Sequence, residues 1–224
     1  MAIITEKKKI FTRLSLYFRI LIIFFCISLV SHESPVHASE NSPVNLSYSS
    51  QGMLQYNILS VWGQYGAGYG EFDSIRDILI GNDNMIYVSD GGNRRIQVFT
   101  LNGTFVHSWG GWVEGTGYYL NPAGIAQDNT GKIYVSDYEK DKINVFTLNG
   151  TLLYSLEIPS KENTIHLGSR EIAVDSKNNI NITEPIDKTI RKINGEGILL
   201  QSWKMNLSYG NGYPGSLAVD EHDN

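Results

Sequence analysis

Cysteine is almost absent from this chain of 224 residues. The only one, Cys26, lies in an N-terminal stretch whose composition differs from that of the remaining sequence. Residues 39–224 therefore cannot form a disulfide with one another, and they offer no thiolate for catalysis or for metal binding. These absences exclude a disulfide-stapled fold and any cysteine-based metal or catalytic site in this part of the chain.

Positive charge is also scarce beyond residue 38. This part of the chain holds 13 lysine and arginine residues against 21 aspartate and glutamate residues, a net charge of −8 with histidine neutral. A domain this acidic is poorly suited to gripping phosphate backbones. We therefore expect no nucleic acid partner.

A long apolar run is lacking as well, although the N-terminus carries a short one. Five basic residues precede or begin an uncharged run of 12 residues, Ile20–Ser31, and the small-residue sequence Val36–Ala38 follows it. This pattern predicts a secretory signal over residues 1–38, because about 20 apolar residues are needed to span a bilayer. The alternative is a single-pass membrane anchor over residues 14–30, and both predictions place the remainder outside the cytoplasm. Residues 39–52 are interpreted as a spacer.

No helical period of 3.6 residues competes after residue 40. Instead, one heptapeptide occurs twice, as Val98–Thr104 and Val145–Thr151, at an offset of 47 residues. The same offset carries Ile86–Asp90 onto Ile133–Asp137 and then onto Ile180–Glu184. A fixed period of this length, filled with short β-rich runs and Asn, Asp or Gly turns, is typical of β-propeller blades. The sequence therefore predicts an all-β fold, a propeller with four-stranded antiparallel blades.

Strand counting over residues 53–224 predicts that this propeller is incomplete. Full blades are expected at about 72–109, 119–158 and 168–203, with orphan strands at about 56–62 and 214–220. We expect a truncated propeller, with an open natural form as the alternative. The end blades would then expose flat faces carrying Ile, Val and Tyr, so self-association of the truncated form is expected.

The residues of the first blade, Ile86–Asp90, Asn93–Phe99 and Gly103–Phe105, resemble the NHL repeat, and Pro122–Ala126 matches its beginning in the second blade. The resemblance covers about 56–224 and implies a β-propeller of about six blades. This fold hosts many unrelated activities. We expect an exported, non-catalytic scaffold that binds or interacts with a partner. The alternative is a fragment of a propeller lyase or hydrolase with a metal-dependent site at the channel mouth. The cytoplasmic NHL proteins with RING modules are disfavoured, because the zinc-binding cysteines are missing.

Catalytic signatures are not visible in the sequence. It shows no Ser/His/Asp triad, and its glycine-rich loops are not followed by a helix that could bind phosphate. We assign no catalytic residue and expect no cofactor. His166 is a weak candidate metal ligand, because it precedes the inner strand of the third blade, whereas a metal site needs three or four ligands. Asp90, Asp137 and Glu184 end the second strands, and we expect them to fix turns through hydrogen bonds rather than to bind calcium.

Aromatic residues and arginines gather in and just after the glycine-rich loops that we expect between blades. Such side chains can form a recognition face for a protein, peptide or glycan, or they can plug the grooves between blades. The candidate binding residues are Tyr65, Tyr69, Arg76, Trp112, Tyr118, Tyr119, Arg170 and Tyr213. Sequons that permit glycosylation of an exported chain occur at Asn45, Asn102, Asn149, Asn181 and Asn206.

Overall fold

The computed structural model describes residues 60–113, 118–158, 171–185, 188–204, 215–220 and 223, with only the backbone of Trp112, Val113, Tyr118 and Tyr119. These residues are all-β and contain no helix, so no helix within them could cross a membrane. The predicted export segment and spacer lie outside the described residues.

Three four-stranded antiparallel sheets form the main body of the described residues, one for each predicted blade. Blade one consists of β3 (Ile75–Ile80), β4 (Met85–Asp90), β5 (Arg95–Thr100) and β6 (Phe105–Gly110). Blade two consists of β9 (Pro122–Gln127), β10 (Ile133–Asp137), β11 (Lys142–Phe146) and β12 (Leu152–Glu157). Blade three consists of β13 (Ile172–Val174), β14 (Ile180–Glu184), β15 (Thr189–Ile193) and β16 (Leu199–Lys204). Consecutive strands are neighbours in every sheet, which is the meander of a propeller blade.

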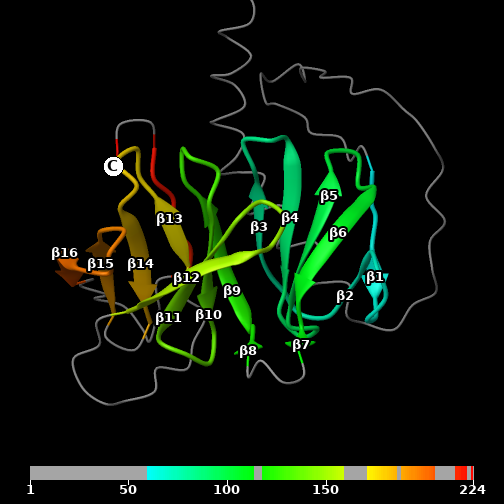
Figure 1. The fold of residues 1–224 in the computed structure, drawn as a ribbon, viewed down its shortest axis with the longest axis horizontal. Helices are drawn as coiled ribbons and strands as arrows, with labels where there is room; N and C mark the ends of the chain where they lie inside the picture. Colours follow the sequence, from blue (N-terminus) through cyan, green and yellow to red (C-terminus); the bar gives the residue numbers. More distant parts are fainter. Residues whose placement is uncertain are drawn as a thin grey trace, which may run out of the picture.

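The three sheets stand side by side with their first strands adjacent (Figure 1). Strand β9 contacts both β3 and β13, so the first strand of each blade is the innermost one. The turns that follow the first and third strands lie at one end of the sheets. The loops that join blades lie at the other end, which is the lower end in Figure 1, where β7 (Trp112–Val113) pairs with β8 (Tyr118–Tyr119). We call this second end the loop face.

Alternating apolar residues on the strands build a core between successive blades. Between blades one and two, Tyr87 and Val98 from blade one pack with Ile125, Ile133 and other buried side chains of blade two. Between blades two and three, the equivalent residues of blade two pack against the isoleucines of β14 and β15. The middle strands of blade two are therefore buried on both faces, which explains the β-branched and aromatic residues found there.

The outer face of blade one is also covered, by the segment that precedes it. Trp62 lies 4.7 Å from Phe99 between ring centroids, and Phe72 completes this third apolar cluster. The segment includes a parallel pair formed by β1 (Gln64–Tyr65) and β2 (Glu71–Phe72). Trp109 occupies the matching position between blades one and two, where it packs on Tyr87 and Phe146.

Four turns among the described residues are built in the same way, and three of them follow the first strand of a blade. A backbone amide closes each turn onto the carbonyl three residues earlier, and the donor residue has a positive φ angle. The turns are Gly81–Asn84, Asp128–Gly131, Asp175–Asn178 and Asp220–Asp223. The fourth turn also contacts the third, because Ser176 donates to the carboxylate of Asp223 through its amide at 2.8 Å and its hydroxyl at 2.7 Å.

The described parts of the chain ends add two details to the sequence-based expectations. Residues 60–62 and 215–220, which are the described parts of the expected orphan strands, are paired in no sheet among the described residues. The exposed end faces were expected to carry Ile, Val and Tyr on both sides. Blade one is instead covered by Trp62 and Phe72, and on blade three Asn181 and Lys192 replace the Tyr and Val of the other blades.

Candidate functional site

The described part of the loop face carries a group of polar and aromatic side chains that joins blade one to blade two. Blade one contributes two arginines, from the start of β3 and from the turn after β4. Blade two contributes side chains from the loop before β9 and the turn after β10. We call this group the seam cluster; it comprises Arg76, Arg94, Asn121, Tyr138 and Glu139.

Arg76 is held at the centre of the seam cluster. Its Nη1 donates to the Oδ1 atom of Asn121 at 2.8 Å and, at a longer 3.3 Å, to the carbonyl of Pro122. Its guanidinium carbon lies 4.0 Å from the centre of the Tyr138 ring, a distance typical of cation–π stacking. Gly91 packs so closely that a Cβ atom there would come within 2.6 Å of Nε. The side chain is thus fixed by contacts from both blades.

Burial lowers the pKa of Arg76, and nearby acidic groups partly oppose this effect. An arginine has an ordinary pKa above 12, so the guanidinium keeps its charge at neutral pH. The result is a half-buried cation beside an aromatic ring. Such an environment strengthens the electrostatic attraction to an anion relative to the same attraction in bulk water.

Arg94 and Glu139 form the more exposed part of the seam cluster. Their side chains meet at 2.9 Å between Nη2 and Oε1, and they are 36% and 41% exposed. An ion pair in this much water contributes at most about 1 kcal/mol to stability. The ion pair nevertheless engages the Glu139 carboxylate with Arg94.

The acid at the end of the second strand plays different parts in the two blades. In blade one, buried Asp90 accepts hydrogen bonds from the Asp73 amide and from the side chains of Asn93, Arg95 and Gln97. This agrees with the expectation that such an acid fixes the following turn. In blade two, the equivalent Asp137 accepts hydrogen bonds from the backbone amides of Asn121 and Glu139. Burial raises the pKa of Asp137, because these amide hydrogen bonds only partly offset its desolvation.

Arg95 and Gln97 also clasp the glycine-rich loop that precedes blade one. Arg95 donates to the carbonyls of Ala67, Gly68 and Glu71, and Gln97 Nε2 donates to Glu71 as well. The amides of Gly66, Gly68 and Gly70 each have an acceptor within the protein, in Phe72, Glu71 and Gln97. These donors are already used within the protein and are not free for a phosphate, so the loop has a structural role in packing against blade one.

The structure places the sequence-predicted binding residues at different sites. Tyr65 and Tyr69 are 80% and 74% exposed on the loop before blade one, and Tyr69 stacks on Phe105 of β6 at 4.6 Å. No described contact links them to Arg76. The backbones of Trp112 and Tyr119 are paired in β7 and β8, as are Val113 and Tyr118. Arg170, Tyr213 and the weak metal candidate His166 lie outside the described residues.

Sequence reasoning missed Tyr138 and Glu139, although a signal was available. At the 47-residue offset they replace Gly91 and Gly92 of blade one. A departure from the repeat marks a residue that the scaffold does not require, and such a departure could have drawn attention to this turn.

The sequons differ in accessibility. Asn102 and Asn149 are exposed in equivalent hairpin turns, whereas Asn181 is 7% exposed within β14. A glycan needs an accessible amide, so Asn102 and Asn149 are the described positions that suit one. Asn45 and Asn206 lie outside the described residues.

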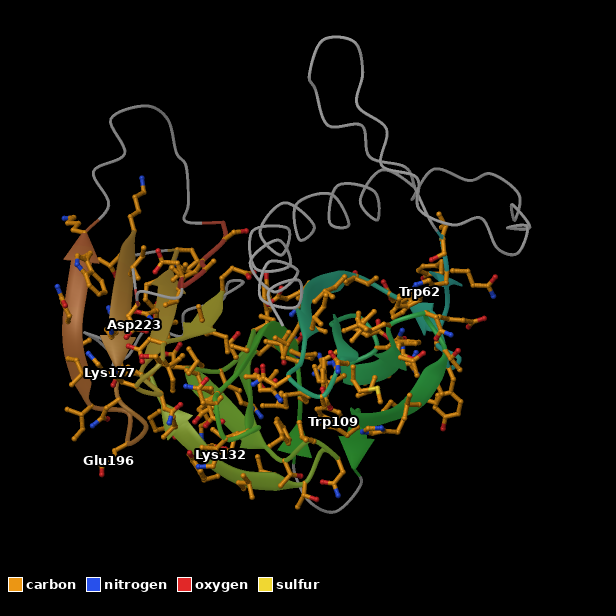
Figure 2. All side chains as sticks on the ribbon, turned by 90° about the horizontal axis from the view of Figure 1, so that it is seen from above. Trp62, Trp109, Lys132, Lys177, Glu196 and Asp223 are labelled. Atoms are coloured by element: carbon orange, nitrogen blue, oxygen red, sulfur yellow. The ribbon has the colours of Figure 1, made fainter. Side chains whose placement is uncertain are left out.

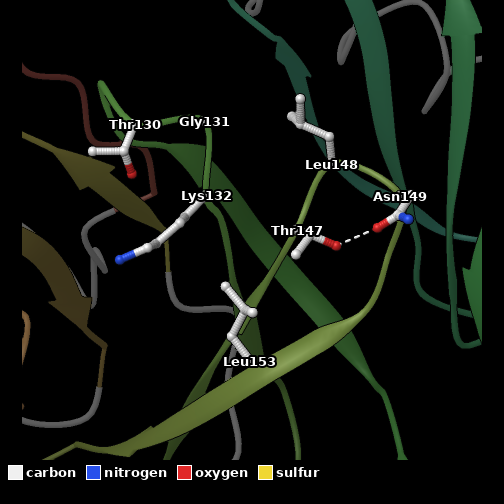
Figure 3. Close-up of a pocket in the computed structure, with 7 residues that line it drawn as sticks. All are labelled: Thr130, Gly131, Lys132, Thr147, Leu148, Asn149 and Leu153. Carbon is white, nitrogen blue, oxygen red and sulfur yellow. Dashed lines mark hydrogen bonds between the residues drawn. The ribbon is translucent and has the colours of Figure 1, made fainter.

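A shallow depression of about 350 Å³, whose lining Figure 3 shows, lies at the turns that follow the first and third strands of blade two, away from the loop face. It is lined by Thr130, Gly131, Lys132, Thr147, Leu148, Asn149 and Leu153. The polar groups of Thr147 and Asn149 are bonded to each other within a hairpin turn. Lys132 extends toward the Tyr154 ring at 5.9 Å. The lining polar groups do not converge on a common point, so the depression is a weaker candidate than the seam cluster.

Over the stretches that the structure describes, no three His, Cys, Asp or Glu side chains are grouped so that they could hold a metal ion.

Comparison with known proteins identifies the fold. Residues 70–179 match a family model described as a 6-bladed beta-propeller, DUF5128. No curated protein matches the sequence significantly.

Solved propeller structures are similar to the chain. Virginiamycin B lyase from Staphylococcus aureus is 17% identical, with a TM-score of 0.51 over 78% of this chain and 52% of the lyase. A protein of unknown function from Bacteroides caccae is 15% identical, with a TM-score of 0.50 over 77% of this chain and 56% of that protein. Identities this low show a shared fold alone. The chain spans about half the length of these structures.

Proposed function

We propose that this chain belongs to an exported NHL-type propeller that acts as a non-catalytic binding scaffold. The loop face is its recognition surface, and the partner is a protein, a peptide or a glycan. The observation that supports this proposal best is the seam cluster. Its half-buried cation, its aromatic ring and its amide come from two blades, in an arrangement that the repeat itself does not require.

The NHL assignment is supported by what the repeat residues do in blade one. Asn93, Arg95 and Gln97, which carry the resemblance, converge on Asp90 and on the loop before the blade. The residues that match the NHL repeat therefore also share a structural role, which supports the assignment more strongly than sequence similarity alone. Export is supported by the basic and apolar character of residues 1–38.

A binding assay on the loop face tests the scaffold proposal. The purified protein is applied to arrays of short peptides and of glycans. The ligands that bind are then tested against the Tyr138→Ala variant and against the Lys132→Ala variant, which serves as the matched control at the opposite end of the blade. We expect Tyr138→Ala to weaken binding and Lys132→Ala to leave it unchanged. Equal loss in both variants, or no dependence on Tyr138, would contradict a recognition surface on the loop face.

The second candidate function is a propeller lyase or hydrolase with a metal site at the channel mouth. The likeness to virginiamycin B lyase favours it only at the level of the fold. Elemental analysis of the purified chain, with and without His166→Ala, separates the two functions. A metal bound in stoichiometric amount and lost in the variant would replace the scaffold proposal.

Export is tested separately. N-terminal sequencing of the mature protein should find Ser39 as the first residue in the soluble fraction. An intact Met1 in the membrane fraction would instead support the anchor over residues 14–30.

A further inference from the structure

We propose that Arg76 is a carboxylate receptor, and that ligands of the loop face bind by placing a carboxylate against the Nε and Nη2 edge of its guanidinium. This inference rests on the scaffold proposal and names the chemistry that the surface selects.

The donor pattern of Arg76 is the first step. Nη1 makes both of its hydrogen bonds to protein acceptors, to Asn121 and to the carbonyl of Pro122. Within the described part of the chain, Nε and Nη2 donate to no acceptor. These two nitrogens form one of the parallel-donor edges of a guanidinium, which matches the two oxygens of a carboxylate.

The second step concerns the neighbouring acids, which are engaged elsewhere. The Glu139 carboxylate is bonded to Arg94 at 2.9 Å. Asp137 is 1% exposed and accepts the amide of Glu139 at 3.0 Å. Arg76 therefore feels both charges at a distance but is bonded to neither. A half-buried cation with no directly bonded anion pays desolvation without the compensation that a paired carboxylate would supply.

Preorganisation is the third step. The Tyr138 ring and the backbone of Gly91 pack on the guanidinium, and Asn121 fixes its rotation. A ligand thus meets a cation whose rotamer entropy is already lost, which reduces the cost of binding.

The repeat supplies the fourth step, because blade two shows that the blade fold does not require an arginine at the position of Arg76. At the 47-residue offset, blade two carries Ala123 in place of Arg76, and it carries Tyr138 in place of Gly91. The arginine recurs at twice the offset, as Arg170, and among the described residues the stacking of this arginine on an aromatic ring is seen at this seam. Blade two is a complete four-stranded sheet with Ala123 at that position.

The carboxylate can belong to the C-terminus of a peptide or to an Asp or Glu side chain, and the test distinguishes these sources. Three acetylated hexapeptides of alanine and serine are titrated calorimetrically into the full chain. One has a free C-terminus, one is amidated with a central glutamate, and one is amidated and neutral. We expect at least one of the charged peptides to bind at least about 10-fold more tightly than the neutral one, because hydrogen bonds to charged groups are the stronger kind. Equal binding by all three, or binding by none, would overturn the carboxylate inference without using any variant.

Variants locate the site. We expect Arg76→Lys to weaken binding of the charged peptide about 10-fold, since lysine keeps the positive charge but lacks the two parallel N–H donors of the guanidinium. Arg76→Gln should remove the difference between charged and neutral peptides, and Lys132→Gln should change nothing. Circular dichroism confirms that each variant is folded. If Tyr138→Ala weakens all three peptides equally while Arg76→Gln has no effect, the recognition surface stands and the carboxylate inference fails.

Discussion

Single residues in this propeller are constrained mainly where two blades touch. Gly103 and Gly150 occupy the same place in two hairpin turns, at φ angles of 84° and 83°, and each lies against a tryptophan. A Cβ atom on Gly150 would come within 2.4 Å of the Trp109 ring. The exact repetition of the surrounding sequence therefore reflects a contact between the turn and the aromatic residue of the adjacent blade.

Gly150→Ala should destabilise the protein more than Gly131→Ala. Both residues have a positive φ angle, so each substitution costs about 1–2 kcal/mol for the left-handed backbone. Gly131 has only Leu148 at 4.0 Å, whereas Gly150 has Trp109, which would have to move. Urea denaturation of both variants measures the difference. Equal losses would show that the tryptophan contact adds nothing.

The dependence of folding stability on pH can also be traced to single residues, of which Asp175 is one. Burial opposes ionisation of Asp175, but hydrogen bonds from Lys192, from Asn179 and from two backbone amides outweigh it and hold its pKa below the usual range. A carboxyl with a lowered folded-state pKa stabilises the protein above its unfolded pKa of about 4, and this contribution is lost as the pH falls through the folded value. Asp175→Asn should therefore destabilise at pH 7, by an amount that shrinks below about pH 4.

Asp137 serves as a control, because its pKa is shifted in the opposite direction and its contribution to stability should depend on pH in the opposite way. Its pKa is raised, so its contribution is present at low pH and is lost as the pH rises through the folded value. Asp137→Asn should cost less than Asp175→Asn at pH 7, and its relative stability should improve as the pH increases. Chemical denaturation at several pH values checks both variants. The same pH dependence in both would refute this account of the buried acids.

At the scale of an element, the third strands of blades one and two show how one repeat position can serve two purposes. Arg95 on β5 binds buried Asp90 at 2.8 Å and holds the preceding loop. Lys142, at the same position on β11, forms an exposed pair with Glu157 at 2.9 Å. The two strands occupy equivalent positions in their sheets, and among the described contacts Arg95 holds the preceding loop whereas Lys142 does not.

Arg95→Ala should be far more damaging than Lys142→Ala. Removing Arg95 leaves the buried Asp90 carboxylate without its ion-pair partner, a change that typically costs about 3–5 kcal/mol. Removing Lys142 breaks a solvated pair worth at most about 1 kcal/mol. The two free energies of unfolding, measured at the same ionic strength, test the contrast. A loss below 1 kcal/mol for Arg95→Ala would show that the clasp is not a major source of stability.

Blade three presents the one sheet face that no other described sheet covers. Asn181, Lys192 and Gln201 lie opposite one another on it, where blade one has Tyr87, Val98 and His107. The adjacent row keeps its apolar character in Ile190 and Trp203, and Trp203 is 40% exposed. The all-side-chain view shows the three sheets with Trp62 beside blade one, at the far side of the molecule from Asp223 and blade three (Figure 2). At the scale of the whole molecule, this face therefore carries a polar row beside an apolar one.

We expect residues 39–224 to self-associate through the apolar row of blade three. Burying that row removes apolar surface from water, at about 25 cal/mol for each Å². Trp203→Glu should shift the protein toward monomer in light scattering. Leu153→Glu, at a similarly exposed residue on β12, should not. A monodisperse monomer of the unsubstituted protein would contradict the expectation.

The sequence by itself determined the repeat, the four-stranded blades and the role of Asp90, because these follow from local period, turn chemistry and alternation. The 47-residue offset even predicts which residues are equivalent. Only the tertiary structure decided which side chains from different blades meet. Arg76 and Tyr138 are 62 residues apart, and no local pattern states that one stacks on the other. The covering of blade one by Trp62 and the polar row on blade three depend likewise on the packing of neighbouring sheets, which brings together residues from distant parts of the chain.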